Sequence, residues 1–511
     1  MTDNKRILKN TLMLYIRMFI SLSISLFTTR VIFQALGLAD MGLYNLVGGV
    51  LSMLGFLNNS MSVATQRFLS YDLGRGDSLE LKKTFGLILT IHICLAISIF
   101  LLAETIGLWF VNSHLQIEPE RIGAANWVYQ VAVCSMMISV LQVPFTASIM
   151  AHEKMGIYAY LSLIDVFSKL AIVYALLYLP GDRLIVYSLL LFATNLLIFL
   201  FNIGYSLKSF SECGFHISWD RKRFIQIFSF SGWNMFGQVT LIANDQVLNI
   251  FLNWFFGTIV NGARGIALRI NGIVVQFVSQ FQVALNPPIV KGYASGDMEG
   301  TRKLVKRGMK LCFLLMLILS TPFLIETDLI LTLWLGESPQ YTVWFTRLCL
   351  INTLIDTMTG PINTCIQATG HIKKMQIGIT SILIFILPLS YIILYLGAKP
   401  YYVVCINIIV SFIALYYRLH ILQRETGFSC INIIKDTIIP CYFAAILSLS
   451  IATGIHIFIN THSIIAGVVI AITSFLTVCA ISYLFALDQQ EKSFILSLLN
   501  KILTKLNKQK Q

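Results

Sequence analysis

Six charged residues lie on polar faces of long apolar stretches in this sequence. They are Arg17, Lys169, Arg269, Asp165, Asp245 and Asp356. A charge at the centre of a bilayer costs about 2.5–3.5 kcal/mol on the insertion scale, so such a residue usually has a partner or lines a pathway. Arginine binds carboxylate or phosphate oxygens through paired hydrogen bonds, and a buried aspartate can hold a cation or a proton. The six residues are therefore candidates for binding substrate or ions.

Each candidate also has a structural interpretation. Asp165 and Lys169 are four residues apart, so on one helix they can neutralise each other. The pair is either a structural ion pair or a substrate contact. The arginines on the first and eighth predicted helices either bind substrate or bridge to Asp245 or Asp356. Those two acids, in turn, either form such a bridge or bind a coupling cation or proton.

Uncharged polar side chains extend several of these helix faces. Asn59 belongs to a series that recurs every seven residues, Asn234 shares a face with Asp245, and Gln276 lies seven residues after Arg269. Lipid offers such groups no hydrogen-bond partner, so a polar stripe faces protein or water. Six helices carry a stripe of this kind. They predict one hydrated cavity between two halves of the protein, with Asn59, Asn234 and Gln276 among its substrate-binding residues.

The composition indicates a membrane protein. The 511 residues are 57% hydrophobic and 12% charged, whereas soluble domains carry about 25% charged residues. The basic residues behind the net charge of +13 are spread between apolar segments, so we expect no nucleic-acid partner. The ten cysteines form no C-x-x-C motif or Cys/His cluster. Motifs for phosphate loops, serine hydrolases and zinc proteases are absent as well. We therefore expect no enzyme activity, no cofactor and no metal.

Fourteen stretches approach the roughly 20 apolar residues that a bilayer-spanning helix needs. They lie near 10–33, 43–69, 84–111, 124–150, 156–179, 184–208, 224–256, 259–290, 308–335, 342–368, 375–396, 401–422, 433–458 and 464–486. We expect an all-α polytopic membrane protein built from two six-helix lobes and two extra C-terminal helices. The predicted parts are an N-terminal lobe over 1–210, a C-terminal lobe over 211–425, an additional helix pair over 426–487 and a basic cytoplasmic tail over 488–511.

A repeat supports the two lobes. The segment 37–83 begins GLADMGLYN and ends LGRGDSLELKK, and the segment 257–303 begins GTIVNGARG and ends YASGDMEGTRK. A constant offset of 220 residues aligns Gly76 with Gly296 and Asp77 with Asp297. The offset skips six predicted helices, an even number. The two lobes are therefore predicted to be parallel repeats, related by an axis along the membrane normal.

The distribution of basic residues predicts the orientation. Lysine and arginine gather at the N-terminus, in alternate connections and in the tail. The opposite side has only Arg121, Arg183, Arg264 and Lys399. Cytoplasmic loops carry such an excess of basic residues, so both termini are predicted to be cytoplasmic.

The opening NTLMLYIRMFISLSISLFTTRVIFQALGLADMGLYNLVGGVLSML and the two basic Gly-Asp loops resemble a known family. They are similar to the Wzx-type polysaccharide flippases of Gram-negative bacteria, within the multidrug/oligosaccharidyl-lipid/polysaccharide (MOP) exporter superfamily. The resemblance covers essentially the whole chain, and its motifs are loose. It implies a bacterial inner-membrane protein that moves undecaprenyl-diphosphate-linked oligosaccharide, such as an O-antigen or capsule unit, to the periplasmic leaflet by alternating access. Membrane lipid, glycan polymerase or assembly proteins, and H⁺ or Na⁺ as coupling ions are the implied partners.

The resemblance also implies roles for individual residues. Cationic residues line the central cavity of such flippases, and Arg17 and Arg269 occupy the corresponding first and eighth helices. Lys169 would assist them. Related peptidoglycan-precursor flippases bind sodium at an acid on the seventh helix, where Asp245 stands in this sequence.

Two other functions stay open. The first is a cation-coupled multidrug exporter, a branch that typically relies on an acid in a lobe cavity. The first helix of this chain carries Arg17 and no acid, which argues against that branch. The second is a non-transporting membrane scaffold for glycan assembly. The short connections leave no docking domain, which argues against a scaffold.

Overall fold

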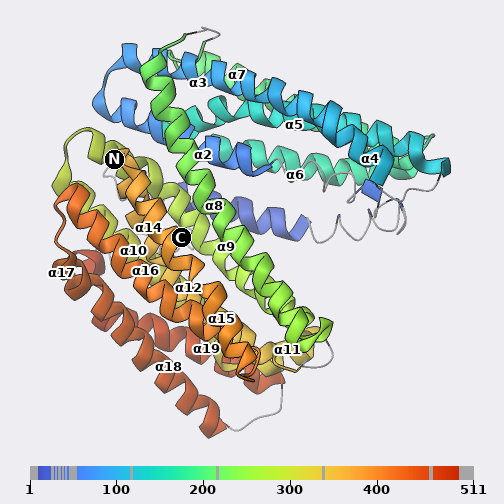
Figure 1. Cartoon of the computed structure of the whole chain (residues 1–511). Coiled ribbons are helices and arrows are strands. Elements are labelled where there is room, and N and C mark those ends of the chain that lie inside the picture. The colour runs from blue at the N-terminus through green and yellow to red at the C-terminus, as the bar shows by residue number, and fades with distance from the viewer. Residues whose placement is uncertain are drawn as a thin grey trace, which may run out of the picture. The chain divides into compact units, whose positions relative to one another are not determined.

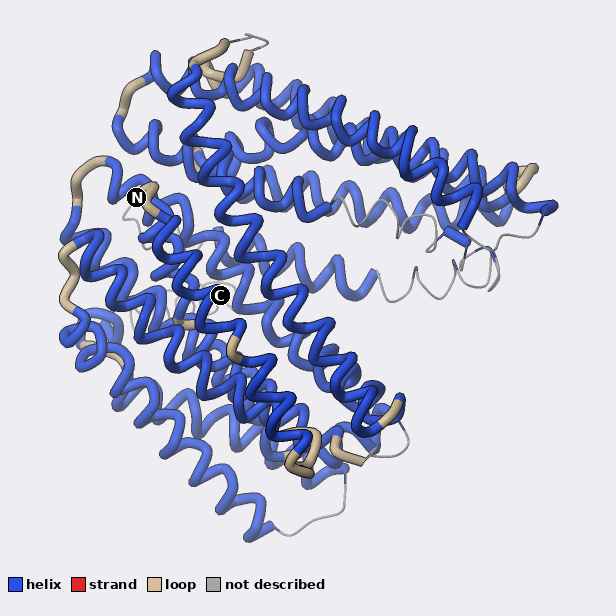
Figure 2. Tube along the Cα trace, viewed as in Figure 1, coloured by secondary structure: helices blue, strands red, loops and turns tan. Residues whose placement is uncertain are grey.

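The structure is a computed structural model that describes residues 10–24, 28, 32, 36, 40, 43–44, 55–114, 119–214, 218–335, 340–459 and 464–493. Every regular element in these ranges is helical (Figure 2), which confirms the all-α prediction. Ten of the described helices are long and apolar enough to cross a membrane. The chain is a multi-pass membrane protein.

Figure 1 shows the described helices coloured in chain order. A helix over Asn10–Ile24 comes first. The next are α2 (Gly55–Arg75), α3 (Ser78–Leu102), α4 (Leu108–His114), α5 (Ile122–Ala151), α6 (Met155–Tyr178) and α7 (Arg183–Ser209). A π-helical turn over Ala103–Gly107 joins α3 to α4, and a 3-10 turn over Pro119–Arg121 precedes α5.

The second half of the chain continues in the same manner. Its helices are α8 (Arg221–Phe256), α9 (Thr258–Ala294), α10 (Met298–Ile325), α11 (Thr327–Leu335), α12 (Thr342–Thr357), α13 (Thr359–Thr369), α14 (Ile372–Ile384), α15 (Ile386–Tyr395) and α16 (Tyr402–Thr426). The C-terminal elements are α17 (Cys430–Ile433), a π turn (Ile434–Ile438), α18 (Ile439–Ile459), α19 (Ile464–Ile481) and a π turn (Ser482–Ala486).

Two predicted spans, 342–368 and 375–396, are interrupted at prolines. The helix α12 ends at Thr357, four residues before Pro361, and α14 ends at Ile384, four residues before Pro388. Proline lacks a backbone N–H, and its ring clashes with the carbonyl of the residue four positions earlier. Each proline therefore ends one helix and lies in the first turn of the next.

The two Gly-Asp loops of the repeat have the same backbone geometry. Gly76 and Gly296 adopt φ values of 71° and 81°, a left-handed conformation that favours glycine. Asp77 and Asp297 follow them, and each accepts a hydrogen bond from the backbone N–H three residues later, at 3.0 and 2.9 Å. A side chain that accepts from this N–H caps the start of a helix. The aligned residues of the repeat thus form matching turns before α3 and α10.

The described chain forms two compact units. Unit 1 comprises Met1–Thr240, Val283–Thr301 and Gln367–Gln376, and unit 2 comprises Leu241–Gln282, Arg302–Ile366 and Ile377–Gln511. In unit 1, α5 packs against α2, α3 and α7. In unit 2, α16 packs against α12 and α15, and α18 packs against α19. The predicted boundaries of the two lobes stay a prediction.

Buried polar contacts hold several helix ends together inside unit 1. The Arg67 guanidinium of α2 donates to the carbonyl oxygens of Gln367 and Ala368, near the end of α13, at 2.9 and 2.7 Å. Three aromatic rings surround this guanidinium, those of Phe68, Tyr71 and Phe230, at 4.4, 4.8 and 5.6 Å.

Two ion pairs accompany this contact in unit 1. Arg223 on α8 pairs with Asp72 on α2 at 2.5 Å. Lys291 on α9 pairs with the buried Glu153 at 2.9 Å. The ends of α8, α9 and α13 are therefore attached to α2 and to the connection between α5 and α6.

Candidate functional site

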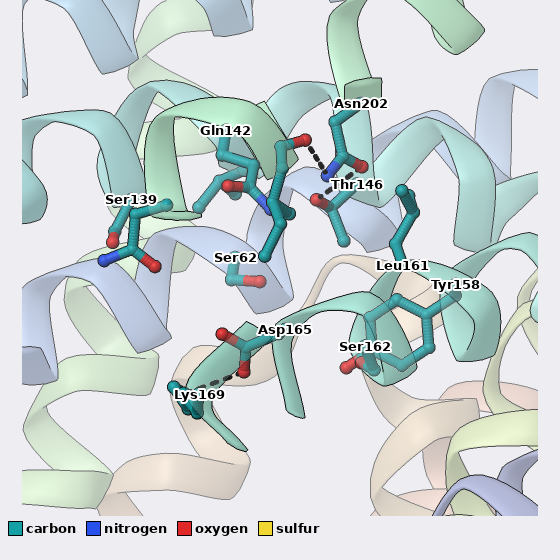
Figure 3. Close-up of a pocket in the computed structure, with 13 residues that line it drawn as sticks. Ser62, Ser139, Gln142, Thr146, Tyr158, Leu161, Ser162, Asp165, Lys169 and Asn202 are labelled. Carbon is teal, nitrogen blue, oxygen red and sulfur yellow. Dashed lines mark hydrogen bonds and ion pairs between the residues drawn. The ribbon is translucent and has the colours of Figure 1, made fainter. Parts of the chain in front are cut away.

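A polar pocket lies inside unit 1, between α2, α5, α6 and α7 (Figure 3). Its volume is about 350 Å³. Hydroxyl and amide side chains dominate its lining, and one ion pair stands among them. The lining residues are Ser62, Ser139, Gln142, Val143, Thr146, Tyr158, Leu161, Ser162, Asp165, Lys169, Asn195, Ile198 and Asn202.

The helix α6 supplies the charged part of the pocket. Tyr158, Leu161, Ser162, Asp165 and Lys169 recur at helical spacing, so they share one face. The Lys169 ammonium donates to Oδ2 of Asp165 at 2.7 Å, as Figure 3 shows. The two side chains remain 47% and 28% exposed. The predicted pairing is confirmed, and both charges are open to a solute in the pocket.

Arg17 lies beside this pocket on the helix Asn10–Ile24. Its Nη1 donates to Oγ of Ser162 at 3.1 Å, and its guanidinium stands 5.0 Å from the centre of the Tyr158 ring. Both partners line the pocket. The structure thus places Arg17 beside the pocket of unit 1 that Asp165 and Lys169 line.

In unit 2, Asp245 on α8 pairs with Arg264 on α9. Arg264 is buried, and its guanidinium also donates to Oδ1 of Asn249. Within unit 2 the carboxylate of Asp245 therefore has Arg264 as its counter-charge, and the alternatives left open for Asp245, a bridge to an arginine or the binding of a coupling ion, stay predictions. The turn at Gly257 folds α9 back along α8, which brings the two charges together.

A second acid of unit 2, Asp356, lies in a polar cluster of α12 and α16. Nδ2 of Asn352 donates to its Oδ2 at 2.9 Å. Ser411 and Arg418 on α16 lie within electrostatic range of its carboxylate. Asp356 therefore has a counter-charge on α16 within unit 2.

The remaining predicted site residues have different surroundings. Arg269 and Gln276 are exposed on α9, and Arg269 forms no ion pair with any residue that the structure describes. Asn59 is exposed on α2, outside the pocket lining. Asn234 is buried on α8, where its Oδ1 accepts a hydrogen bond from Gln376 at 3.3 Å. The cavity predicted between two six-helix lobes, with these residues in its wall, stays a prediction.

Sequence reasoning missed that Arg67 binds backbone carbonyl oxygens and that Arg264 and Arg418 lie opposite the acids Asp245 and Asp356. It treated them as basic residues of the connections, which set the orientation. One signal was available for Arg264. A carboxylate within a membrane helix requires a counter-charge, and α9 follows α8 after one residue. Arg67 and Arg418 are separated from their partners by 300 and 62 residues, and no local pattern marks them.

Comparisons with known proteins show which solved structures this fold resembles. No protein-family model and no curated protein sequence matches the chain. Solved structures of MATE transporters do match. One of them, a MATE protein in which a proline is replaced by alanine, has a TM-score of 0.71 at 13% identity, covering 82% of this chain and 97% of that one.

Two other MATE structures each have a TM-score of 0.67. One is an outward-facing multidrug resistance transporter of the MOP superfamily, 14% identical, with 82% and 96% coverage. The other is ClbM in complex with Rb⁺, 16% identical, with 82% and 95% coverage. The chain has the fold of MATE transporters, which have twelve helices in two lobes.

Proposed function

We propose that this chain is a cation-coupled exporter that works by alternating access, with the pocket of unit 1 as a substrate site. The observation that carries the proposal is the Asp165–Lys169 pair inside a polar pocket, in a chain with a MATE fold. The drug-exporting branch was expected to place an acid in a lobe cavity. Asp165, an acid in the pocket of unit 1, supports that branch, although the first helix has no acid in its described part.

The size of the pocket favours a small substrate. Pockets for drug-sized ligands occupy about 300–1,000 Å³, and this pocket, at about 350 Å³, lies at the low end of that range. A lipid-linked oligosaccharide would place only one part of itself there. Hydroxyl and amide groups such as Ser139, Gln142 and Asn195 would orient the polar end of a small amphiphile by hydrogen bonds.

The ion pair gives this site a mechanism. The Lys169 ammonium, 2.7 Å from Asp165, already neutralises the carboxylate. A cationic substrate, a proton or a metal cation must therefore compete with Lys169 for Asp165. Because both side chains lie on α6, occupation of Asp165 releases Lys169 into the pocket without any movement of a helix. Alternating access would then expose the occupied site on the other side of the membrane.

Coupling ions are part of this proposal. The similar structure of ClbM holds Rb⁺, so a monovalent cation is a reasonable coupling ion for this chain as well. Asp245 and Asp356 in unit 2 are our candidate coupling acids beside Asp165. We further propose the bacterial inner membrane as the location, with the basic connections on the cytoplasmic side.

A second candidate function is the export of undecaprenyl-diphosphate-linked glycan. The observation in its favour is Arg17, whose guanidinium lies against Ser162 and Tyr158 beside a lining of sugar-compatible hydroxyl and amide groups. An arginine there would bind a phosphate or an acidic sugar. The opposite roles of Asp165 and Lys169 separate the two candidates: a cationic substrate needs the acid, whereas an anionic substrate needs the lysine.

The test is an export assay in cells. Cells that express the chain are expected to tolerate lipophilic cations better than cells without it. Asp165→Asn should abolish that tolerance at equal protein level. Asp328→Asn makes the same chemical change at an exposed acid on α11 and should leave it intact.

The same cells, lacking their own flippase, are tested for surface glycan. If the chain restores glycan and Lys169→Ala or Arg17→Ala removes it, while tolerance to cations never appears, the second function replaces the first.

A further inference from the structure

One face of α9 covers the turn between α5 and α6 (152–154) inside unit 1. Ala284 of α9, Leu14 of the helix Asn10–Ile24 and Met155 of α6 are fully buried and form one apolar cluster. Seven residues further along α9, Lys291 pairs with Glu153 at 2.9 Å. Residues seven apart lie on the same face of a helix. The contact of α9 with the α5–α6 turn therefore has an apolar part and an ion pair.

Glu153 is held in an unusual conformation at this contact. Its φ is 59°, which is uncommon for a residue other than glycine and persists only where the surroundings fix it. Its side chain is 1% exposed. Nδ2 of Asn10 donates to its backbone carbonyl oxygen at 3.2 Å. The first helix and α9 thus bind the same residue of the turn.

The sequence repeat has a second contact of the same kind. The offset of 220 residues places α2 opposite α9 and His152 opposite Ile372, the first residue of α14. The Arg67 guanidinium of α2 binds two carbonyl oxygens at the end of α13, directly before the turn into α14. Each of the two equivalent helices therefore binds the turn that belongs to the other repeat.

The two equivalent helices also touch each other in unit 1. A Cβ atom at Gly74 of α2 would lie 2.6 Å from the carbonyl oxygen of Lys291 and 2.8 Å from Cβ of Ala294. Distances this short are not found between real Cβ atoms and their neighbours. Only glycine allows the end of α2 to lie so close to the end of α9.

These contacts lie next to the polar pocket. Tyr158 lines the pocket and also packs against the apolar cluster at the α5–α6 turn. On α2, the lining residue Ser62 precedes Arg67 by five residues, about 7.5 Å along the helix axis. Both contacts are therefore on the side of the pocket where α2 ends and α6 begins.

We propose that the two contacts form a gate that closes the unit 1 pocket toward the cytoplasm, with Lys291 and Glu153 as its ion-pair latch. The basic connections on this side give the orientation. In the closed gate the two charges neutralise each other away from water. Water solvates both when α9 separates from the turn, so the latch is reversible. This inference rests on the proposed function, because a gate serves a site that substrate enters and leaves.

The test measures access to the pocket from the cytoplasmic side. Ser139→Cys places a single cysteine in the pocket lining of an otherwise cysteine-free, full-length protein. A membrane-impermeant maleimide then labels it in inside-out vesicles. Lys291→Met removes the ammonium that pairs with Glu153, and the labelling rate should rise at least tenfold, equivalent to about 1.4 kcal/mol in the opening equilibrium. The matched control, Lys82→Met at an exposed lysine on α3, should leave the rate unchanged.

Two further variants separate a gate from a general loss of structure. Exchange of the charges, Glu153→Lys with Lys291→Glu, should return the rate toward that of the parent protein. Gly74→Ala should raise the rate, because the added Cβ pushes α2 away from α9. A rate that Lys291→Met leaves unchanged, or that the exchanged pair does not restore, would overturn the proposal.

The labelling does not require a transported substrate, so the two proposals can fail separately. A chain that exports nothing but shows these changes in labelling loses the proposed function and keeps the gate. A chain that exports while Lys291→Met leaves the labelling rate unchanged loses only the gate.

Discussion

Replacement of Arg67 by alanine should release the end of α13 from α2. The guanidinium donates two hydrogen bonds to backbone carbonyls, at 2.9 and 2.7 Å, and hydrogen bonds to charged groups contribute about 1.5–3 kcal/mol each. Contacts with the rings of Phe68 and Tyr71 add about 0.5–1 kcal/mol each. The lower bound for the two hydrogen bonds alone is about 3 kcal/mol. That free energy shifts the equilibrium between the attached and the released state by about 100-fold.

Hydrogen–deuterium exchange measures this release without labels. In Arg67→Ala, amides of the segment Gln367–Gln376 should exchange at least about 100-fold faster than in wild type, because exchange reports local opening. Arg67→Lys keeps the charge and loses the planar pair of donors. The exchange rate of these amides in Arg67→Lys should therefore lie between the rates in wild type and in Arg67→Ala. The matched control is Arg75→Ala, at the exposed end of the same helix. Unchanged exchange in Arg67→Ala would refute the reasoning.

Three further predictions concern stability. Gly296→Ala should lower the melting temperature by the equivalent of about 1–2 kcal/mol, because the residue has φ 81°. Gly272→Ala, at an open position inside α9, should not lower it. Glu491→Gln should lower the free energy of unfolding by about 3–5 kcal/mol, since it leaves Lys310 buried without the carboxylate that lies 2.9 Å away. Glu120→Gln, at an exposed site, should leave the free energy of unfolding unchanged. Burial lowers the pKa of His152, against a smaller opposite effect of Glu212. The unfolded chain therefore binds a proton below about pH 6.5 that the folded protein resists. The melting temperature should fall as the pH drops from 7.5 to 5.5, and His152→Gln should reduce that fall.

Local patterns in the sequence were sufficient for several features of the structure. Apolar runs predicted the helices, and the 220-residue offset aligned two turns that share left-handed glycines, Gly76 and Gly296. The spacing of four residues between Asp165 and Lys169 predicted their ion pair. Each of these features depends on residues close together in the chain or on a comparison of equivalent segments.

Partners from distant helices were beyond such patterns. The contacts of Arg67 with α13 and of Arg17 with Ser162 depend on how the helices pack. The proline breaks had a local signal: Pro361 and Pro388 mark the ends of α12 and α14. Hydropathy alone did not predict these breaks, because it counts apolar residues and ignores backbone hydrogen bonds.

The most direct test of the proposed substrate site is the binding of a lipophilic cation, tetraphenylphosphonium, to the purified full-length protein. Asp165→Asn should weaken binding at least tenfold. Lys169→Ala should strengthen it, because the carboxylate then has no internal competitor, and Asp328→Asn should leave the Kd unchanged. For an anionic probe, tetraphenylborate, we expect the opposite: Asp165→Asn should strengthen binding and Lys169→Ala should weaken it. If neither Asp165→Asn nor Lys169→Ala changes the Kd for the cation, the pocket of unit 1 is not the substrate site, and the central claim fails.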